Sequence, residues 1–131
     1  MADSITIERS VDIEYVLKTA LAAKFTAYCP PLPKALTVPC VEVQQVGGSR
    51  EKRLDTFTIK LDSRAETPAT AIEQLNNAVG YLIATAEANT TAIRAVTINA
   101  AASWGQDPAR PDLAMATATL LVCAHPERKI L

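Results

Sequence analysis

The stretch Pro39–Asp62, PCVEVQQVGGSREKRLDTFTIKLD, decides how this chain folds. Apolar and polar residues alternate on both sides of a turn-forming Gly47-Gly48 pair. Such period-two patterning around a glycine pair is typical of an antiparallel hairpin. We therefore predict two strands joined by a glycine-led, charged loop of about six residues, longer than a tight hairpin needs. The alternating apolar residues are Val41, Val43, Phe57, Ile59 and Leu61.

The tip of this hairpin is a candidate contact surface. Gly47 and Gly48 offer positive φ at little steric cost, and Arg50, Lys52 and Arg53 keep the tip in solvent. Long loops on rigid scaffolds often bind partners. A phosphate-binding loop is excluded, because that motif places its glycines between a strand and a helix. A simply solvated charged tip is the alternative to a contact role.

Two helices flank the hairpin. Ser10 is the expected N-cap of the first, which has acidic residues in its first turn and ends near Ala27. A proline-rich connector, Cys29–Pro33, then interrupts helical structure. The second helix starts at Thr67-Pro68, runs to about Ala88, and is closed by Asn89-Thr90-Thr91. The apolar stripe of the first helix is Ile13, Val16, Leu17, Ala20, Leu21 and Phe25, and that of the second is Ile72, Leu75, Val79, Leu82, Ile83 and Ala86.

Two further strands are predicted at Ile93–Ala102 and Leu113–Ala124, separated by a turn-rich loop, Trp104–Pro111. Residues 1–9 are expected to form an arm or a short edge strand, and residues 125–131 a polar tail. The order is then α-β-β-α-β-β. We predict an α+β domain with two helices packed on a mainly antiparallel four-stranded sheet.

Composition limits the class of protein. The 131 residues suit one domain, 1–131, but aromatic residues are only 5% and alanine contributes much of the 49% apolar fraction. A thin core favours stabilisation by assembly with other chains. A net charge of −1 argues against general nucleic-acid coating. We expect no membrane span and no signal peptide, and the three unpatterned cysteines suggest reduced, intracellular thiols.

Chemistry-bearing residues are scattered along the sequence. His125, the sole histidine, stands in the tail without a ligand cluster, and the cysteines lack an activating context. No spacing pairs the carboxylates for acid–base work. We therefore predict no catalytic residues, no metal site and no cofactor. Trp104 and Asp107 are candidates for a partner contact, because tryptophan is enriched where partners dock; local packing is the alternative for Trp104.

Taken together, three blocks of the chain resemble the tail terminator proteins of long-tailed bacteriophages. These are SVDIEYVLKTALAAKF with its proline-rich link, VPCVEVQQVGGSREKRLDTFTIKLDSRA running into TPATAIEQLNNAVGYLI, and WGQDPARPDLAMATATLLVCA. The resemblance covers about residues 10–124. The chain departs from the family at Asp62-Ser63-Arg64-Ala65, where such proteins often carry a tryptophan-alanine pair.

The resemblance implies a virion protein, assembled in the host cytoplasm, that forms a homohexameric ring on the last ring of the tail tube. Such a ring stops tube polymerisation and presents a surface to the head-completion or stopper protein. Its channel passes the genome DNA without sequence-specific binding. Our candidates for assembly or channel contacts are Gly47, Gly48, Arg50, Lys52, Arg53, Trp104 and Asp107.

Three alternatives stay open. Another head–tail connector component, such as a stopper or an adaptor, would bind on the portal side. A small-molecule-binding α+β domain would need a pocket with convergent polar groups. An enzyme would need an activated nucleophile or an acid–base pair.

Overall fold

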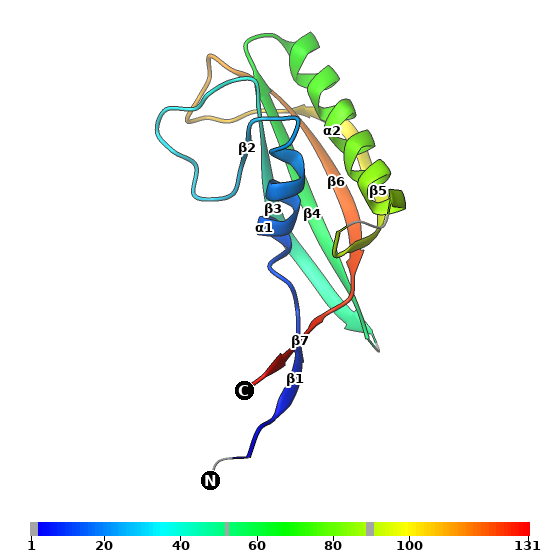
Figure 1. The fold of residues 1–131 in the computed structure, drawn as a ribbon. Helices are drawn as coiled ribbons and strands as arrows, with labels where there is room; N and C mark the ends of the chain where they lie inside the picture. The colour runs from blue at the N-terminus through cyan, green and yellow to red at the C-terminus, as the bar shows by residue number, and fades with distance from the viewer. Residues whose placement is uncertain (1–2, 52, 89–90) are drawn as a thin grey trace.

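The computed structural model describes residues 3–51, 53–88 and 91–131. Two helices, α1 (Ile13–Leu21) and α2 (Pro68–Ala88), cover one face of a five-stranded sheet (Figure 1). A separate two-stranded ribbon projects from one end of this body (Figure 1). The strands are β1 (Thr6–Arg9), β2 (Ala27–Tyr28), β3 (Cys40–Glu51), β4 (Leu54–Ala65), β5 (Ile93–Gly105), β6 (Ala114–Ala124) and β7 (Glu127–Ile130).

The predicted α+β class with two helices is confirmed, but the four-stranded antiparallel sheet is wrong. The sheet has the order β2-β3-β4-β6-β5, and β2 runs parallel to β3 while the other neighbours are antiparallel. The additional strand arises because the chain turns extended directly after α1. The amide of Val41 donates to the carbonyl of Thr26 at 2.9 Å, next to the two-residue β2. A strand of two residues is too short to show any periodicity.

The first helix begins later and ends earlier than its sequence suggests. Asp12, not Ser10, is the N-cap, and its carboxylate accepts from the amide of Tyr15 at 3.2 Å. The hydroxyl of Ser10 accepts instead from the guanidinium of Arg50. At the other end the helix stops at Leu21 rather than near Ala27. The amide of Phe25, beyond the helix, donates to the carbonyl of Leu21 at 2.8 Å.

The hairpin is present, but the six-residue glycine-led loop is wrong. β3 continues through Gly47 and Gly48 to Glu51, β4 starts at Leu54, and Arg53 lies in a turn between them. The register shifts between Gln45 and Gly47, and no described glycine has positive φ. Gly48 is required by close approach instead, since a Cβ there would lie 3.1 Å from the carbonyl oxygen of Thr56. Lys52 lies outside the described residues.

The second helix is confirmed from Pro68 to Ala88. The Thr67 hydroxyl accepts from the amide of Thr70 at 3.3 Å, as a capping residue should. Of the predicted closing residues, Asn89 and Thr90 lie outside the described part. Gln74 ties the helix to the sheet, because its amide nitrogen donates to the Ser63 hydroxyl at 2.8 Å and to the Cys40 carbonyl at 2.9 Å.

The second half of the chain differs from prediction in its strand ends. β5 extends to Gly105, so Trp104 belongs to a strand rather than to a loop. Three register shifts interrupt its pairing with β6. Ile98 pairs directly with the buried Leu120, but it is half exposed because β5 is the edge strand of the sheet. The expected polar tail contains β7, which pairs antiparallel with β1. The expected N-terminal strand exists, but it lies in the ribbon and not at the sheet edge.

The core lies between the helices and the sheet. Its largest fully buried side chains are aliphatic and come from both helices and from strands β3 to β6. They include Ile13, Leu17, Leu21, Val41, Val43, Ile59, Leu61, Leu75, Leu82, Ile93, Leu120 and Val122. Alanines such as Ala71, Ala78 and Ala118 fill the space where α2 approaches the sheet, which keeps the layer thin.

We predict that Leu75→Ala and Leu82→Ala each lower the free energy of unfolding by about 2–5 kcal/mol, because each side chain is fully buried beneath α2. Urea denaturation followed by circular dichroism measures the change. Asn77→Ala, on the exposed side of the same helix, is the matched control and should change stability by about 0.5 kcal/mol or less. Equal effects for Leu82→Ala and Asn77→Ala would contradict this placement of the core.

Candidate assembly surfaces

The ribbon joins the two ends of the chain. Thr6 pairs with Ile130 and Ile7 with Lys129, and reciprocal backbone hydrogen bonds extend the pairing to Ile5 and Leu131. Figure 1 shows both termini at the far end of this ribbon, away from the helices. A two-stranded ribbon has little stability alone, so its base must be held by the body.

The two faces of the ribbon differ in chemistry. Directly opposite residues share a face, so Ile5, Ile7, Lys129 and Leu131 lie together on one side, with the Arg9–Glu127 ion pair at its base. We call these four residues the apolar ribbon face. Ile5 is 61% exposed and Leu131 is 67% exposed. An exposed apolar stripe on a projecting arm is typical of an interaction surface rather than of a solvated tail.

An arginine clamp fixes the base of the ribbon to the hairpin. Arg50 forms a bidentate pair with Asp55, at 2.6 Å for Nε to Oδ1 and 3.2 Å for Nη2 to Oδ2. The same guanidinium donates to the Ser10 hydroxyl at 3.1 Å and to the Glu8 carbonyl at 3.4 Å. The end of β1 and the residue that follows it are therefore held by the end of the β3–β4 hairpin. On the β7 side, the His125 ring nitrogen Nδ1 lies 3.1 Å from the Arg53 carbonyl.

The clamp keeps the carboxyl of Asp55 in its charged form. The hydrogen bond from Arg50 holds the pKa of Asp55 below its ordinary value of 3.8, although burial of the carboxyl opposes this shift. Asp55 is almost fully buried, so its charge depends on that partner. The clamp is thus intact wherever Asp55 is ionised.

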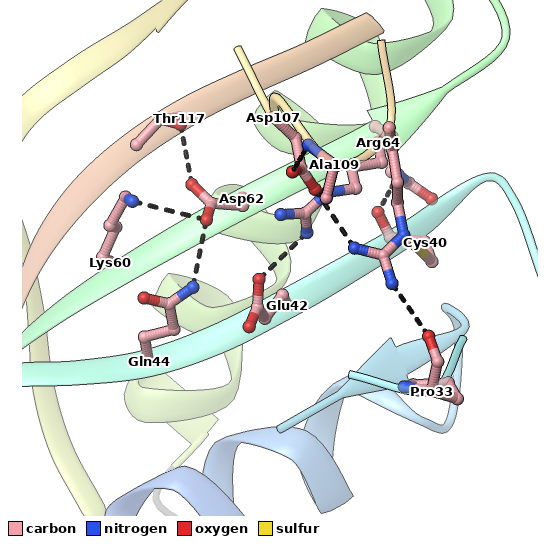
Figure 2. A network of polar contacts seen from close by, with 12 residues as sticks. Pro33, Cys40, Glu42, Gln44, Lys60, Asp62, Arg64, Asp107, Ala109 and Thr117 are labelled. Atoms are coloured by element: carbon pink, nitrogen blue, oxygen red, sulfur yellow. Dashed lines mark hydrogen bonds and ion pairs between the residues drawn. The ribbon is translucent and has the colours of Figure 1, made fainter. Parts of the chain in front are cut away.

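A buried polar network occupies the face of the sheet that the helices leave open (Figure 2). Arg64 is only 5% exposed, and its guanidinium contacts Glu42 at 2.9 Å and Asp107 at 3.1 Å. Arg110 contacts Asp107 at 3.3 Å and donates to the Pro33 carbonyl at 2.8 Å. The loop after β5 and the proline-rich connector are therefore joined over Arg64.

A second set of contacts continues this network along β4. Asp62 accepts from Thr117 at 2.7 Å and from Gln44 at 3.1 Å, and Lys60 lies 3.5 Å from the same carboxylate (Figure 2). Within the described part of the chain, no buried side-chain nitrogen or oxygen lacks a partner. The network is therefore satisfied internally and offers no vacant polar group for a ligand.

The charges of the network reinforce one another. Burial alone would lower the pKa of Arg64, but the hydrogen bond to Glu42 and the nearby carboxylates hold that pKa above its ordinary value. Burial would raise the pKa of Asp107, whereas the amide of Ala109 and the guanidinium of Arg110 hold it below 3.8. Both groups thus stay charged over the neutral range.

The loop that Arg64 holds forms one wall of an apolar pocket of about 640 Å³. Trp104, 58% exposed, stands in its lining together with the first residue of α2. We call this hollow the Trp104 pocket. Its main apolar lining residues are Pro68, Trp104, Pro108, Pro111, Leu113 and Met115.

Of the seven predicted contact residues, Lys52 lies outside the described ranges, and the other six fall in separate places. Gly47 and Gly48 lie inside β3, and Arg50 is engaged in the clamp. Arg53 is an exposed turn residue, with its Nε 3.9 Å from the carboxylate of Glu8. Trp104 lines the pocket, and Asp107 binds Arg64 and Arg110. The structure therefore does not bring these six residues together into one surface.

Sequence reasoning missed the ribbon and both arginine centres. Asp55 and Arg64 carry no local signal, because their partners lie on other elements. The tail motif ERKI, with its β-branched end, offered a faint strand signal that could pair with TIER. The alternation along β4 does place three polar residues on one face of the strand, but it does not indicate that this face is buried. They are Lys60, Asp62 and Arg64.

Two of the cysteine thiols are not activated. Burial raises the pKa of the Cys29 and Cys40 thiols, the opposite of what activates a nucleophile. Among the described residues, no group of three histidine, cysteine or acidic side chains is placed to hold a metal ion. No helix in the described ranges is long and apolar enough to cross a membrane.

Comparisons with known proteins give no assignment. No protein-family model matches the sequence, and no curated protein matches it.

Removing Arg64 should be strongly destabilising. We predict that Arg64→Ala lowers the free energy of unfolding by about 3–5 kcal/mol, because Glu42 and Asp107 would be left without their central partner. Thermal unfolding by calorimetry measures this loss. Lys24→Ala, an exposed lysine, is the control and should be nearly neutral; a neutral Arg64→Ala would show that the network contributes little.

The ribbon clamp should weaken in acid. Because the folded pKa of Asp55 is lowered, its contribution is present above 3.8 and is lost as the pH falls through the folded pKa. We expect ¹⁵N relaxation to show increased motion of the Ile7 amide below that pH, and Asp55→Asn to show it already at pH 7. The Ile59 amide in the core serves as the internal control at pH 7. Unchanged Ile7 dynamics in Asp55→Asn would contradict the clamp.

Proposed function

We propose that this chain is a phage tail terminator: the protomer of a ring that caps the tail tube, stops its polymerisation and receives the head-completion protein. The observation that carries the proposal is the ribbon, in which both chain ends project from the body with an apolar face exposed. A protein that acts alone gains nothing from exposing Ile5 and Leu131 on an arm. A protomer gains stability by burying that face against a neighbour.

The sheet edge supports assembly through the arm rather than through strand addition. β5 is the last strand of the sheet order, so its outer edge is open to solvent. Three register shifts interrupt it. Such irregularities blunt an edge as a template for indiscriminate pairing. The ring contacts we propose are therefore made by side-chain surfaces.

The proposed mechanism is steric. A ring of these protomers matches the end of the tube on one side and lacks, on its other side, a surface that would seed another tube ring. Heterologous contacts close into a ring when the rotation between neighbours divides a full turn. Host cytoplasm is the proposed place of assembly, and the genome passes through the channel without sequence-specific contacts. No cofactor enters this mechanism.

Two other functions are alternatives to the terminator function. A stopper or adaptor would use the same kind of arm but bind on the portal side of the neck. The Trp104 pocket is the observation that favours a small-molecule-binding domain. However, Asp107 is the one charged residue among its described lining residues, and both oxygens of that carboxylate are occupied by Arg64, Arg110 and the Ala109 amide.

The test is a co-assembly assay with the tube protein of the same phage. We predict that adding this chain during polymerisation shortens the tubes, and that negative-stain electron microscopy shows six-fold rings at tube ends. An equal concentration of serum albumin is the control. Tubes of unchanged length without end rings would refute the terminator function. Binding to the portal-side connector instead would assign the chain to the stopper or adaptor class.

A further inference from the structure

The apolar ribbon face and the Trp104 pocket lie at opposite ends of the sheet. Ile93 of β5 and Asp55 of β4 both pair with Ala124, at the end of β6 next to the ribbon. Gly105 pairs with Met115 at the other end, where the Trp104 pocket lies. Figure 1 shows β1 and β7 beyond one end of the long strands.

The ribbon cannot reach the pocket of its own chain. β6 spans 11 residues, roughly 35 Å at about 3.3 Å per residue. Each ribbon strand spans four residues, about 13 Å. Arg50 holds the base of the ribbon at the hairpin end, and the ribbon projects from the end of the sheet opposite the pocket (Figure 1). If these two surfaces meet, they belong to different copies.

Charge also matches between the two surfaces. Lys129 lies on the apolar ribbon face and forms no ion pair with any described residue. A second hollow shares Leu113 with the Trp104 pocket and is lined by Glu66 and Asp112, both exposed and without an ion pair in the described ranges. Arg110 and Lys34 line the same hollow, but Arg110 is engaged by Asp107. With Arg110 engaged, the two carboxylates outnumber Lys34, so a lysine beside apolar side chains on the arm suits an apolar pocket with this hollow next to it.

We propose that the apolar ribbon face of one copy docks into the Trp104 pocket of the next copy, and that this head-to-tail contact joins the protomers. Ile5 and Leu131 cover the tryptophan and proline surface, and Lys129 faces Glu66 and Asp112. The inference rests on the proposed ring, because it names the contact between its copies. The contact is heterologous, so each copy uses its ribbon once and its pocket once.

A complementation experiment tests the contact on the full chain. Ile5→Ser with Leu131→Ser removes the ribbon surface, and Trp104→Ala removes the pocket surface. We expect each variant alone to associate about tenfold more weakly or worse than the wild-type protein in sedimentation velocity. Mixed together, the two variants should form one-to-one dimers and nothing larger, because only one intact ribbon and one intact pocket can meet.

Matched controls lie on the opposite side of the same ribbon. Ile130 is 69% exposed, and both Ile130 and Arg128 lie on the other face, so Ile130→Ser and Arg128→Glu should leave association unchanged. Lys129→Glu should weaken association, and combining it with Glu66→Lys and Asp112→Lys should restore it. All substituted side chains are exposed, so circular dichroism should show an unchanged fold.

The outcomes separate this contact from the proposed function. A wild-type protein that stays monomeric, ribbon and pocket variants that associate like wild type, or a mixture that gives no dimer would each overturn the contact. A protein that shortens tubes without using these surfaces keeps the terminator function and loses the contact. Head-to-tail oligomers that leave tube length unchanged keep the contact and refute the terminator function.

Discussion

The structure depends on the burial of β4 on both of its faces. On the helix side, Ile59 and Leu61 are fully buried beneath α2, as the alternating pattern requires. On the other side, the same alternation places Asp62 and Arg64, which are buried as well. A buried guanidinium is tolerated only when carboxylates neutralise it and the remaining donors are satisfied. That requirement draws in Glu42 from β3 and Asp107 from the loop after β5.

The architecture of the open face follows from this requirement. Asp107 fixes the loop after β5 over the sheet, and Arg110 extends the contact to the proline-rich connector at Pro33. The loop so placed becomes a wall of the Trp104 pocket. The pocket is therefore a consequence of neutralising Arg64, and its shape is held by ion pairs rather than by apolar packing alone.

The sequence predicts those elements whose causes are local. The apolar stripe and the capping Thr67 were enough to place α2, and alternation was enough to place β3, β4 and β6. What failed depends on partners distant in the chain. The sequence around Ser10 predicts a helix cap, but in the structure its hydroxyl binds Arg50. The glycine pair predicts a turn, but Gly48 instead allows the close approach of the Thr56 carbonyl. Of the candidate contacts, Trp104 lines the pocket, and no sequence pattern indicated the ribbon that we propose to meet it.

The ribbon shows why the ends of the chain were the hardest part to predict. Its two strands come from opposite termini, and neither has a hydrophobic pattern long enough to stand out. Each arginine centre fixes one end of the same rigid sheet: Arg50 sets the direction of the ribbon, and Arg64 sets the wall of the pocket. The ribbon is a separate sheet, so its angle to the pocket depends on the contacts that Arg50 makes at its base. In a head-to-tail assembly that angle sets the rotation from one copy to the next, and with it whether the assembly closes into a ring or grows as a filament.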